Sequence, residues 1–488
     1  MSVGATSIAH MFETLDDAAL VESITAASRE QSAACGRELM AIGELYARRA
    51  PEDDDERANW AIDGHANVVA EVAAALNISR GRAASRLHYA IDLHERLPKV
   101  AEVFARGQID FRMMTALVNR SSNVKDDDRL ARLDAAFAKW SPKWMKLSGP
   151  KLHERIDMWV EKFDPDGVRE PKPPNDDRYV EVGPIGPGMV GVWAKLAFAD
   201  GMAFDTRLDE IAATVCRDDP RTVSQRRADA MTAMSAGQMR LECGCGAEDC
   251  QNGSPGGPTS QVVINVIAEQ ATIEGRSDNP GYLPGFGAVP ASMLREMIAT
   301  AQVRPVPLPE PCAEQGYRPS AALARFIRWR DLTCRFPGCD VPASACQIDH
   351  TVPYPMGPTH PSNLKLLCGF HHLLKTFWCG SDGWSDRQFA DGTVIWTAPN
   401  WQTYTTTPGG AEFFEQLGRP TGDITVASHP SGPGDLHRGA KMPTRRRTRA
   451  EDKAYRIALE RQHNAARNRR IQFLLAERLA RDDEPPPF

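Results

Sequence analysis

The chain has 488 residues, a hydrophobic share of 42%, a charged share of 25% and a formal net charge of −6. These values are typical of a soluble protein that is large enough for two to four domains. No uncharged apolar run reaches the length of a membrane span, and the first 17 residues lack the basic start and apolar stretch of a secretion signal. We therefore expect a cytoplasmic protein with no membrane partner.

Basic charge is concentrated in two parts of the chain. Seven Lys and Arg outnumber three Asp and Glu in residues 318–379, and fourteen outnumber eight in residues 435–488. Because the total is −6, these excesses of +4 and +6 leave −16 for the remainder. Gathered positive charge favours contact with phosphate groups, so these two segments are the ones expected to approach nucleic acid.

Residues 12–163 predict helices in series, because leucines and isoleucines recur at roughly helical spacing. Within this region residues 75–98 resemble a short helix, a turn and a second helix of a DNA-reading element, with Ser79 as a cap. Arginines 80, 82 and 86 would lie on the second helix. The alternative is an exposed helix face that contacts only solvent.

Pro and Gly residues punctuate 164–190 and mark a boundary. Beyond it, residues 176–310 predict a mixed α/β region, which includes a β-branched run at 261–273 that is typical of a strand. Cys243, Cys245 and Cys250 lie between its elements and could bind a metal ion. They could equally be free thiols of a loop, because no fourth ligand is near them in the sequence. Eleven cysteines in two clusters indicate thiols and metal ligands rather than disulfides.

The densest set of metal-capable side chains begins at residue 334. Cys334 and Cys339 are separated by four residues, Cys368 follows after a further 28, and His371 after two more. Two short-spaced pairs that are joined by a long segment suit a closed tetrahedral zinc site, which would be structural.

A second pattern lies inside the first. Asp349 and His350 are adjacent, Asn363 follows after twelve residues and His372 after another eight. A carboxylate and an imidazole can hold a divalent metal ion and leave positions for water and phosphate. On an extended strand His350 would point to the side opposite Asp349, where it would be free to act as a base.

This Asp-His-x12-Asn-x8-His pattern, enclosed by CRFPGC and CGFHH, resembles the HNH endonuclease motif. Residues 15–402 as a whole resemble actinobacterial proteins that join a helical domain of unknown function to an HNH nuclease, the mycobacterial "thirteen-E-twelve" repeat family. The resemblance implies that His350 is the general base, that Asp349 and His372 bind the catalytic metal, and that Asn363 holds the loop carrying the base. The implied products are a 5′-phosphate and a 3′-hydroxyl.

The resemblance also implies a ββα-metal fold: a strand that ends at His350, a short strand over 364–367 and a helix from about Gly369. His371 stands where many members of the family have a second cysteine, and Cys346 competes with it as a ligand. Cys346 is otherwise a small buried apolar residue.

Several basic residues are candidates for DNA contact. Ser320 is expected to cap a helix that carries three of them, and two more lie in the motif itself. The candidates are Arg325, Arg328, Arg330, Lys365 and Lys375.

The segments after the motif predict a hairpin, a linker and a tail. Residues 383–401 have the turn residues of a hairpin, whose aromatic side chains Trp384, Phe389 and Trp396 would pack in a core or stack on bases. Residues 403–444 are rich in Thr, Gly, Pro and Ser and predict a flexible linker. Residues 445–482 predict a basic amphipathic helix, which would either clamp nucleic acid or be a solvated tail.

The expected fold class is multidomain α+β: a helical domain (12–163), a mixed α/β continuation (176–310), a small zinc-bearing ββα-metal domain (318–402), the linker and the basic helix. The expected function is hydrolysis of DNA phosphodiester bonds with a structural Zn2+ and a catalytic Mg2+, Mn2+, Ni2+ or Zn2+. Cutting both strands with one active site per chain would favour a homodimer. The alternatives are a catalytically silent, zinc-stabilised module that binds nucleic acid or protein, and a nicking partner that needs another protein.

Overall fold

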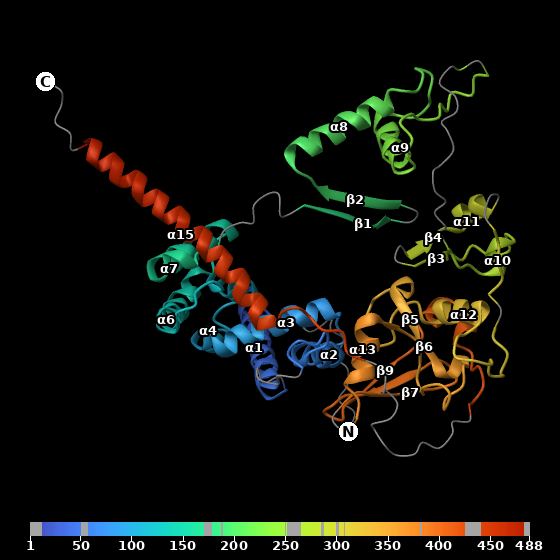
Figure 1. Ribbon diagram of the computed structural model, residues 1–488, viewed down its shortest axis with the longest axis horizontal. Coiled ribbons are helices and arrows are strands. Elements are labelled where there is room, and N and C mark those ends of the chain that lie inside the picture. The colour runs from blue at the N-terminus through green and yellow to red at the C-terminus, as the bar shows by residue number, and fades with distance from the viewer. Residues whose placement is uncertain are drawn as a thin grey trace. The chain divides into compact units, whose positions relative to one another are not determined.

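The chain forms two compact units in the computed structural model, Met1–Glu170 with Val306–Phe488, and Pro171–Pro305. The first unit joins regions that the sequence predicted as separate domains. The residues described are 12–49, 57–169, 178–186, 189–248, 250, 265–284, 287–298, 302–306, 308–380, 383–424 and 441–482. Figure 1 shows their helices and strands.

The N-terminal part of the first unit is helical, as the apolar spacing predicted. Its helices are α1 (Asp17–Arg49), α2 (Gly64–Leu76), α3 (Arg80–Glu95), α4 (Pro98–Ala105), α5 (Phe111–Ser121), α6 (Asp127–Trp144) and α7 (Gly149–Phe163). Aspartate side chains cap α2, α5 and α6 by accepting from the backbone N–H three residues on, which satisfies donors that a helix start leaves open. Leu39, Leu87, Phe104 and Phe137 are fully buried in its core.

The arginines of the predicted DNA-reading element are partly engaged within the protein. Arg86 of α3 pairs with Glu38 of α1 at 2.5 Å, and the guanidinium of Arg80 lies 4.6 Å from the ring centre of Phe370. Ser79 stands at the start of α3, but its side chain makes no capping hydrogen bond. Arg80 and Arg86 therefore make contacts inside this unit. Arg82 is exposed.

The C-terminal part of the first unit begins with α12 (Ala321–Asp331). Strand β5 (Cys346–His350) pairs antiparallel with β6 (Leu364–Cys368), and α13 (Gly369–Phe377) follows directly. These elements lie where strand, strand and helix were predicted. Short 3-10 turns at Ala343–Ala345 and Pro361–Asn363 precede the two strands.

A second small sheet follows. Strands β7 (Ser385–Gln388) and β8 (Val394–Thr397) form the predicted hairpin, and β9 (Thr403–Thr406) adds a third strand. The linker prediction is therefore wrong at its start, where β9, α14 (Gly410–Phe413) and a 3-10 turn at Glu415–Gly418 are found. Residues 425–440 of that linker lie outside the described residues. Trp384 and Trp396 are buried beside Phe336, which confirms core packing for these two rings.

The helical part and the β5–β6–α13 region are packed against each other. The indole N–H of Trp378 donates to the carbonyl oxygen of Ile62 at 2.8 Å, and that of Trp384 donates to the side-chain oxygen of Asn67 at 2.9 Å. Gly338 has a φ of +75°, and a Cβ there would lie 2.5 Å from the carbonyl oxygen of Ile78. Only glycine fits this close approach and this backbone conformation.

The basic tail forms α15 (Arg449–Asp482), whose first half is docked on the helical part. Basic side chains of α15 form ion pairs with buried carboxylates of the helical part. Arg449 lies 2.6 Å from Asp63, Lys453 lies 3.3 Å from Asp92, and Arg461 lies 2.5 Å from Asp164. Apolar residues of the expected stripe, among them Leu459, Ile471 and Leu474, remain exposed. Much of the basic charge at the start of the tail is therefore neutralised within the protein.

The second unit contains small elements. Strands β1 (Tyr179–Gly186) and β2 (Met189–Lys195) form one hairpin, and β3 (Gly281–Leu283) and β4 (Gly287–Val289) another. Its helices are α8 (Phe198–Ala212), α9 (Val223–Ser235), α10 (Gln270–Ile273) and α11 (Ala291–Ile298). The strand predicted for 261–273 is wrong over 270–273, which is helical, while 261–264 lie outside the described residues. No helix in the described part of the chain has the length and apolar character to cross a membrane.

Candidate functional site

Three cysteines and a histidine meet beside α13. Donor atoms of Cys334, Cys339, Cys368 and His371 all lie within 4.8 Å of one another. The Nδ1 atom of His371 is 3.5 Å from the sulfur of Cys334 and 3.3 Å from that of Cys368. Zinc bonds of about 2.1 to 2.3 Å at tetrahedral angles place ligand atoms roughly 3.6 to 3.8 Å apart. This group could therefore hold a zinc ion.

The local structure explains why these ligands face each other. The turn at Gly338 brings Cys339 back towards Cys334, and the end of β6 passes Cys368 directly into the first turn of α13. Phe336 stacks on the ring of His371 with 3.9 Å between centroids. The Nδ1 atom of His371 is the nitrogen that faces the sulfurs. The Nε2 atom of the same ring is buried without a hydrogen-bond partner.

Cys346, the competing ligand, is buried and lies outside this group. Its thiol is directed at the carbonyl oxygen of Val341, 3.4 Å away. It behaves as the small buried residue that was the alternative to a ligand.

The carboxylate of Asp349 is the centre of a buried charge cluster. Its Oδ2 atom lies 3.0 Å from the ammonium of Lys365 and 2.6 Å from that of Lys375. Lys365 also pairs with Asp386 at 2.6 Å. Burial pushes the pKa of Asp349 upward, but the two ammonium groups outweigh it and hold the pKa at about 2. The carboxylate is therefore ionised at neutral pH.

The other oxygen of Asp349 faces His372. Its Oδ1 atom lies 3.6 Å from Nε2 of His372, whose side chain is about one-third exposed. Two ligands of one divalent ion, with bonds of about 2.1 Å, lie roughly 3.0 to 3.4 Å apart at octahedral or tetrahedral angles. The separation of Oδ1 of Asp349 and Nε2 of His372 is within a few tenths of an ångström of that range, and the His372 side chain is partly open to solvent.

His350 points away from Asp349 into a separate contact. Its Nε2 atom lies 3.0 Å from the hydroxyl oxygen of Thr359, and its ring stacks on Tyr317 with 5.2 Å between centroids. The Thr359 hydroxyl donates to the carbonyl oxygen of Gly316 at 2.6 Å, so it accepts from Nε2–H of His350. This assigns the free lone pair to Nδ1. Burial lowers the pKa of His350, which keeps the ring neutral at pH 7.

Asn363 fastens the loop that follows His350. Its side-chain oxygen accepts from the backbone N–H of Val352 at 2.8 Å, and its amide nitrogen donates to the carbonyl oxygens of Val352 and Pro358, both at 2.9 Å. These three bonds close the loop on itself beside the end of β5.

Three of the DNA-contact candidates are committed to other contacts. Arg330 is buried, pairs with Asp331 and donates to the carbonyl oxygens of Pro361 and Leu364. Lys365 is fully buried in the charge cluster, so the prediction that these two residues contact DNA is wrong. Lys375 is largely buried and bonds to Asp349 and to the carbonyl oxygen of His350. Arg328 is exposed and Arg325 is half-buried.

Sequence reasoning missed Thr359 and Asp386, which contact the predicted site residues directly. Neither belongs to a spaced motif, and their positions depend on how the 351–360 loop and β7 fold back. A third omission is Cys216, which joins Cys243, Cys245 and Cys250. Its distance of 26 intervening residues from Cys243 gave no sequence signal.

Comparison with known proteins identifies the family. The model of the domain of unknown function DUF222 matches residues 26–331, which is more than half of the chain, and the chain belongs to this family. The family model ends before Cys334.

The relatives are mycobacterial proteins of uncharacterized function. The uncharacterized protein Rv2100 of Mycobacterium tuberculosis is 42% identical and aligns with 100% of this chain and 95% of its own length. The uncharacterized protein Rv3776 of the same species is 43% identical over 93% of this chain and 91% of its own length. No solved structure matches the chain.

Proposed function

We propose that the chain is a metal-dependent HNH-type endonuclease that hydrolyses DNA phosphodiester bonds, with His350 as general base. The observation that carries the proposal is the pairing of Asp349 with His372 across β5 and α13, next to a neutral, oriented His350. The order of β5, β6 and α13 supports the proposal, because the ββα-metal unit that the sequence pattern implies has the same order of strand, strand and helix.

Asp349 and His372 are the residues that would hold the catalytic metal, through Oδ1 and Nε2. A bound divalent ion would supply electrostatic stabilisation of the scissile phosphate and of the departing oxygen. Lys365 and Lys375 keep Asp349 ionised and fix its orientation, because both bond to its other oxygen.

His350 would take a proton from the attacking water at Nδ1 while Thr359 holds Nε2–H. The water oxygen would then bond to phosphorus as the bond to the 3′-oxygen breaks, and the departing 3′-oxygen would take a proton from solvent water, which leaves a 5′-phosphate and a 3′-hydroxyl. Asn363 keeps the loop after His350 closed, so that the base is presented from a fixed backbone.

The zinc group would be structural, because four protein ligands close the coordination shell. His371 and His372 are neighbours in α13, so a zinc ion that holds His371 also fixes where His372 lies. Removing one of its cysteines, as in Cys334→Ser, should unfold this region rather than slow a chemical step.

The test is plasmid cleavage by purified full-length wild type and His350→Ala. Both are stripped of loosely bound metal and supplied with Mg2+, Mn2+, Ni2+ or Zn2+, and retained zinc is quantified. We expect metal-dependent cleavage that falls at least about 100-fold in His350→Ala, since a general base contributes about that much or more. His94→Ala, which changes an exposed histidine of α3, is the matched control and should cut normally.

Equal cleavage by wild type and His350→Ala would exclude His350 as the base. If folded, zinc-loaded wild type cuts no DNA form with any of the four metals, the chain is the silent binding module instead.

A further inference from the structure

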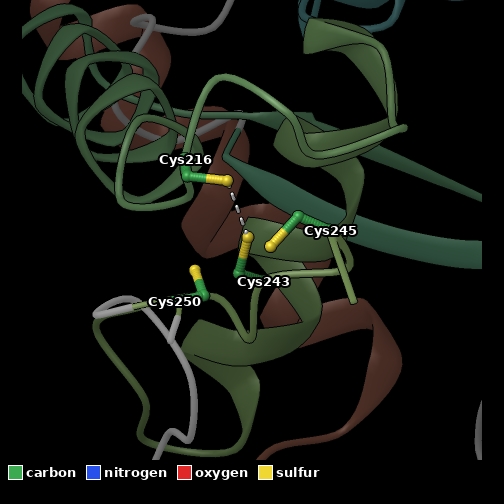
Figure 2. A group of neighbouring side chains, drawn as sticks. All are labelled: Cys216, Cys243, Cys245 and Cys250. Atoms are coloured by element: carbon green, nitrogen blue, oxygen red, sulfur yellow. Dashed lines mark hydrogen bonds between the residues drawn. The ribbon is translucent and has the colours of Figure 1, made fainter. Parts of the chain in front are cut away.

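Four cysteines of the second unit meet at one point, although only three of them are close in sequence. Cys216 lies after the end of α8, and Cys243, Cys245 and Cys250 lie in the segment that follows α9. Their sulfur atoms all lie within 4.8 Å of one another, and those of Cys216 and Cys243 are 3.4 Å apart. Figure 2 shows the four side chains directed towards a common centre.

The spacing of the sulfurs fits one tetrahedral metal ion. Four thiolates with Zn–S bonds of about 2.3 Å have their sulfurs about 3.8 Å apart, which lies inside the observed range. A disulfide would need a separation of about 2.05 Å, and all four cysteines are free. Thiolates of a multinuclear iron–sulfur cluster bind different iron atoms, which sets their sulfurs farther apart than those of one tetrahedral ion.

Backbone amides support the sulfurs in the way metal-bound thiolates need. The amide of Asp218 hydrogen-bonds to the sulfur of Cys216, and that of Cys245 to the sulfur of Cys243, each two residues ahead along the chain. The amide of Val341 does the same for Cys339 in the first zinc group. The same amide-to-sulfur arrangement therefore occurs in both groups of candidate ligands.

A buried side chain aligns the two halves of the group. Asp219, whose carboxylate is fully buried, accepts from the backbone N–H of Gly244 at 2.8 Å, between Cys243 and Cys245. Arg221 bonds to the same carboxylate and to the carbonyl oxygen of Glu242 at 2.6 Å. The turn after Cys216 and the Cys243–Cys245 loop are therefore fixed to each other without any contribution from a metal.

The described residues around these cysteines form a small hydrophobic core. It contains six buried residues from α8, α9 and the segments beside them, Leu208, Ile211, Val215, Ala230, Ala233 and Leu241, with a few partly buried side chains packed against them. A core of this size leaves a small margin over the conformational entropy of the chain, and small domains commonly add a structural metal for that reason.

We propose that Cys216, Cys243, Cys245 and Cys250 bind a second, structural zinc ion that links the end of α8 to the segment after α9. Four protein thiolates close the shell, so the ion has no open position for catalysis. A mononuclear iron would fit the same geometry, but divalent zinc binds a given thiolate site more tightly than ferrous iron. The site is independent of the proposed nuclease chemistry.

Metal stoichiometry of the purified full-length chain tests this proposal. Elemental analysis should give two zinc ions per chain for wild type, and one for each of Cys216→Ser and Cys334→Ser. Cys312→Ser, which changes an exposed cysteine outside both groups, should keep two. Proteolysis within 171–305 should increase in Cys216→Ser and not in Cys312→Ser.

Cobalt replacement identifies the ligands even if Cys216→Ser is insoluble. Cys334→Ser would then retain only the second site, and its Co2+ form should show the absorption of a tetrahedral four-thiolate centre. One zinc in wild type that Cys216→Ser leaves unchanged would overturn the proposal. So would iron in place of zinc, or a reducible disulfide among the four cysteines.

Discussion

At the scale of single residues, Thr359 decides which nitrogen of His350 is free. Its hydroxyl accepts from Nε2–H because its own hydrogen is given to Gly316. Thr359→Val removes the acceptor and frees the ring to rotate, so cleavage should fall about 10-fold or more in kcat with little change in KM. Thr359→Ser keeps the hydroxyl and should restore most of the rate. Equal loss in the Val and Ser variants would mean that the hydrogen bond to His350 does not set the rate, because the Ser variant keeps the hydroxyl.

The ligand residues could be predicted from sequence because their spacing is local. Cys334, Cys339, Cys368 and His371 come from two short segments, which a hydrogen bond from the backbone N–H of Arg335 to the carbonyl oxygen of Leu366 joins. The fate of Lys365 and Arg330 could not be predicted in this way. A basic residue next to a motif looks the same in sequence whether it faces DNA or a buried carboxylate. Lys365 pairs with Asp386, which belongs to a later strand, so the sequence around Lys365 does not indicate this contact.

At the scale of elements, β7 and α2 are joined by one buried hydrogen bond. Trp384 precedes β7 and donates to the side chain of Asn67, which is 4% exposed. Trp384→Phe keeps most of the ring packing but leaves the Asn67 oxygen without its donor, which should cost about 1 to 3 kcal/mol of unfolding free energy. Urea denaturation measures this. Trp401→Phe is the matched control, because Trp401 is 71% exposed and should change stability by less than about 0.5 kcal/mol. If the two variants are equally stable, the bond does not contribute.

The elements themselves were largely predictable, since helix periodicity and the β5–β6–α13 pattern are local signals. The third strand β9 was not, because its Thr-rich sequence has the composition of a linker and becomes a strand only by pairing with β8. The β-branched residues Thr272 and Ile273 illustrate the reverse case, in which tertiary context placed a strand-like segment in a helix.

At the scale of the whole molecule, α15 places cations beside three buried carboxylates of the N-terminal part of the first unit. Asp63, Asp92 and Asp164 are each 6% exposed or less and lose a cationic partner if the tail is absent. A chain that ends at Thr444 should therefore melt several degrees lower than full length, because Asp63 loses both Arg445 and Arg449, and Asp92 and Asp164 each keep only one cationic partner. A chain that ends at Arg478 keeps all three pairs and should melt like full length. Equal melting temperatures for the two truncated chains would show that docking of α15 does not stabilise the fold.

The pairing of α15 with the first helices joins residues about 300 to 390 positions apart, such as Arg461 with Asp164 and Arg449 with Asp63. Charge counts along the sequence located the basic tail but not the carboxylates that it contacts. They did not indicate that the partners would neutralise each other, because the tail was equally compatible with nucleic acid.

The most direct measurement of the central claim is the chemistry of the cut ends. Supercoiled plasmid is incubated with wild type and Mg2+, the nicked product is isolated, and DNA ligase is added. A 3′-hydroxyl beside a 5′-phosphate is the substrate that ligase seals, so we predict that the nicks close, and that His350→Ala produces few nicks to close. Nicks that ligase cannot seal, or nicks that His350→Ala makes as quickly as wild type, would contradict hydrolysis by His350 at this site.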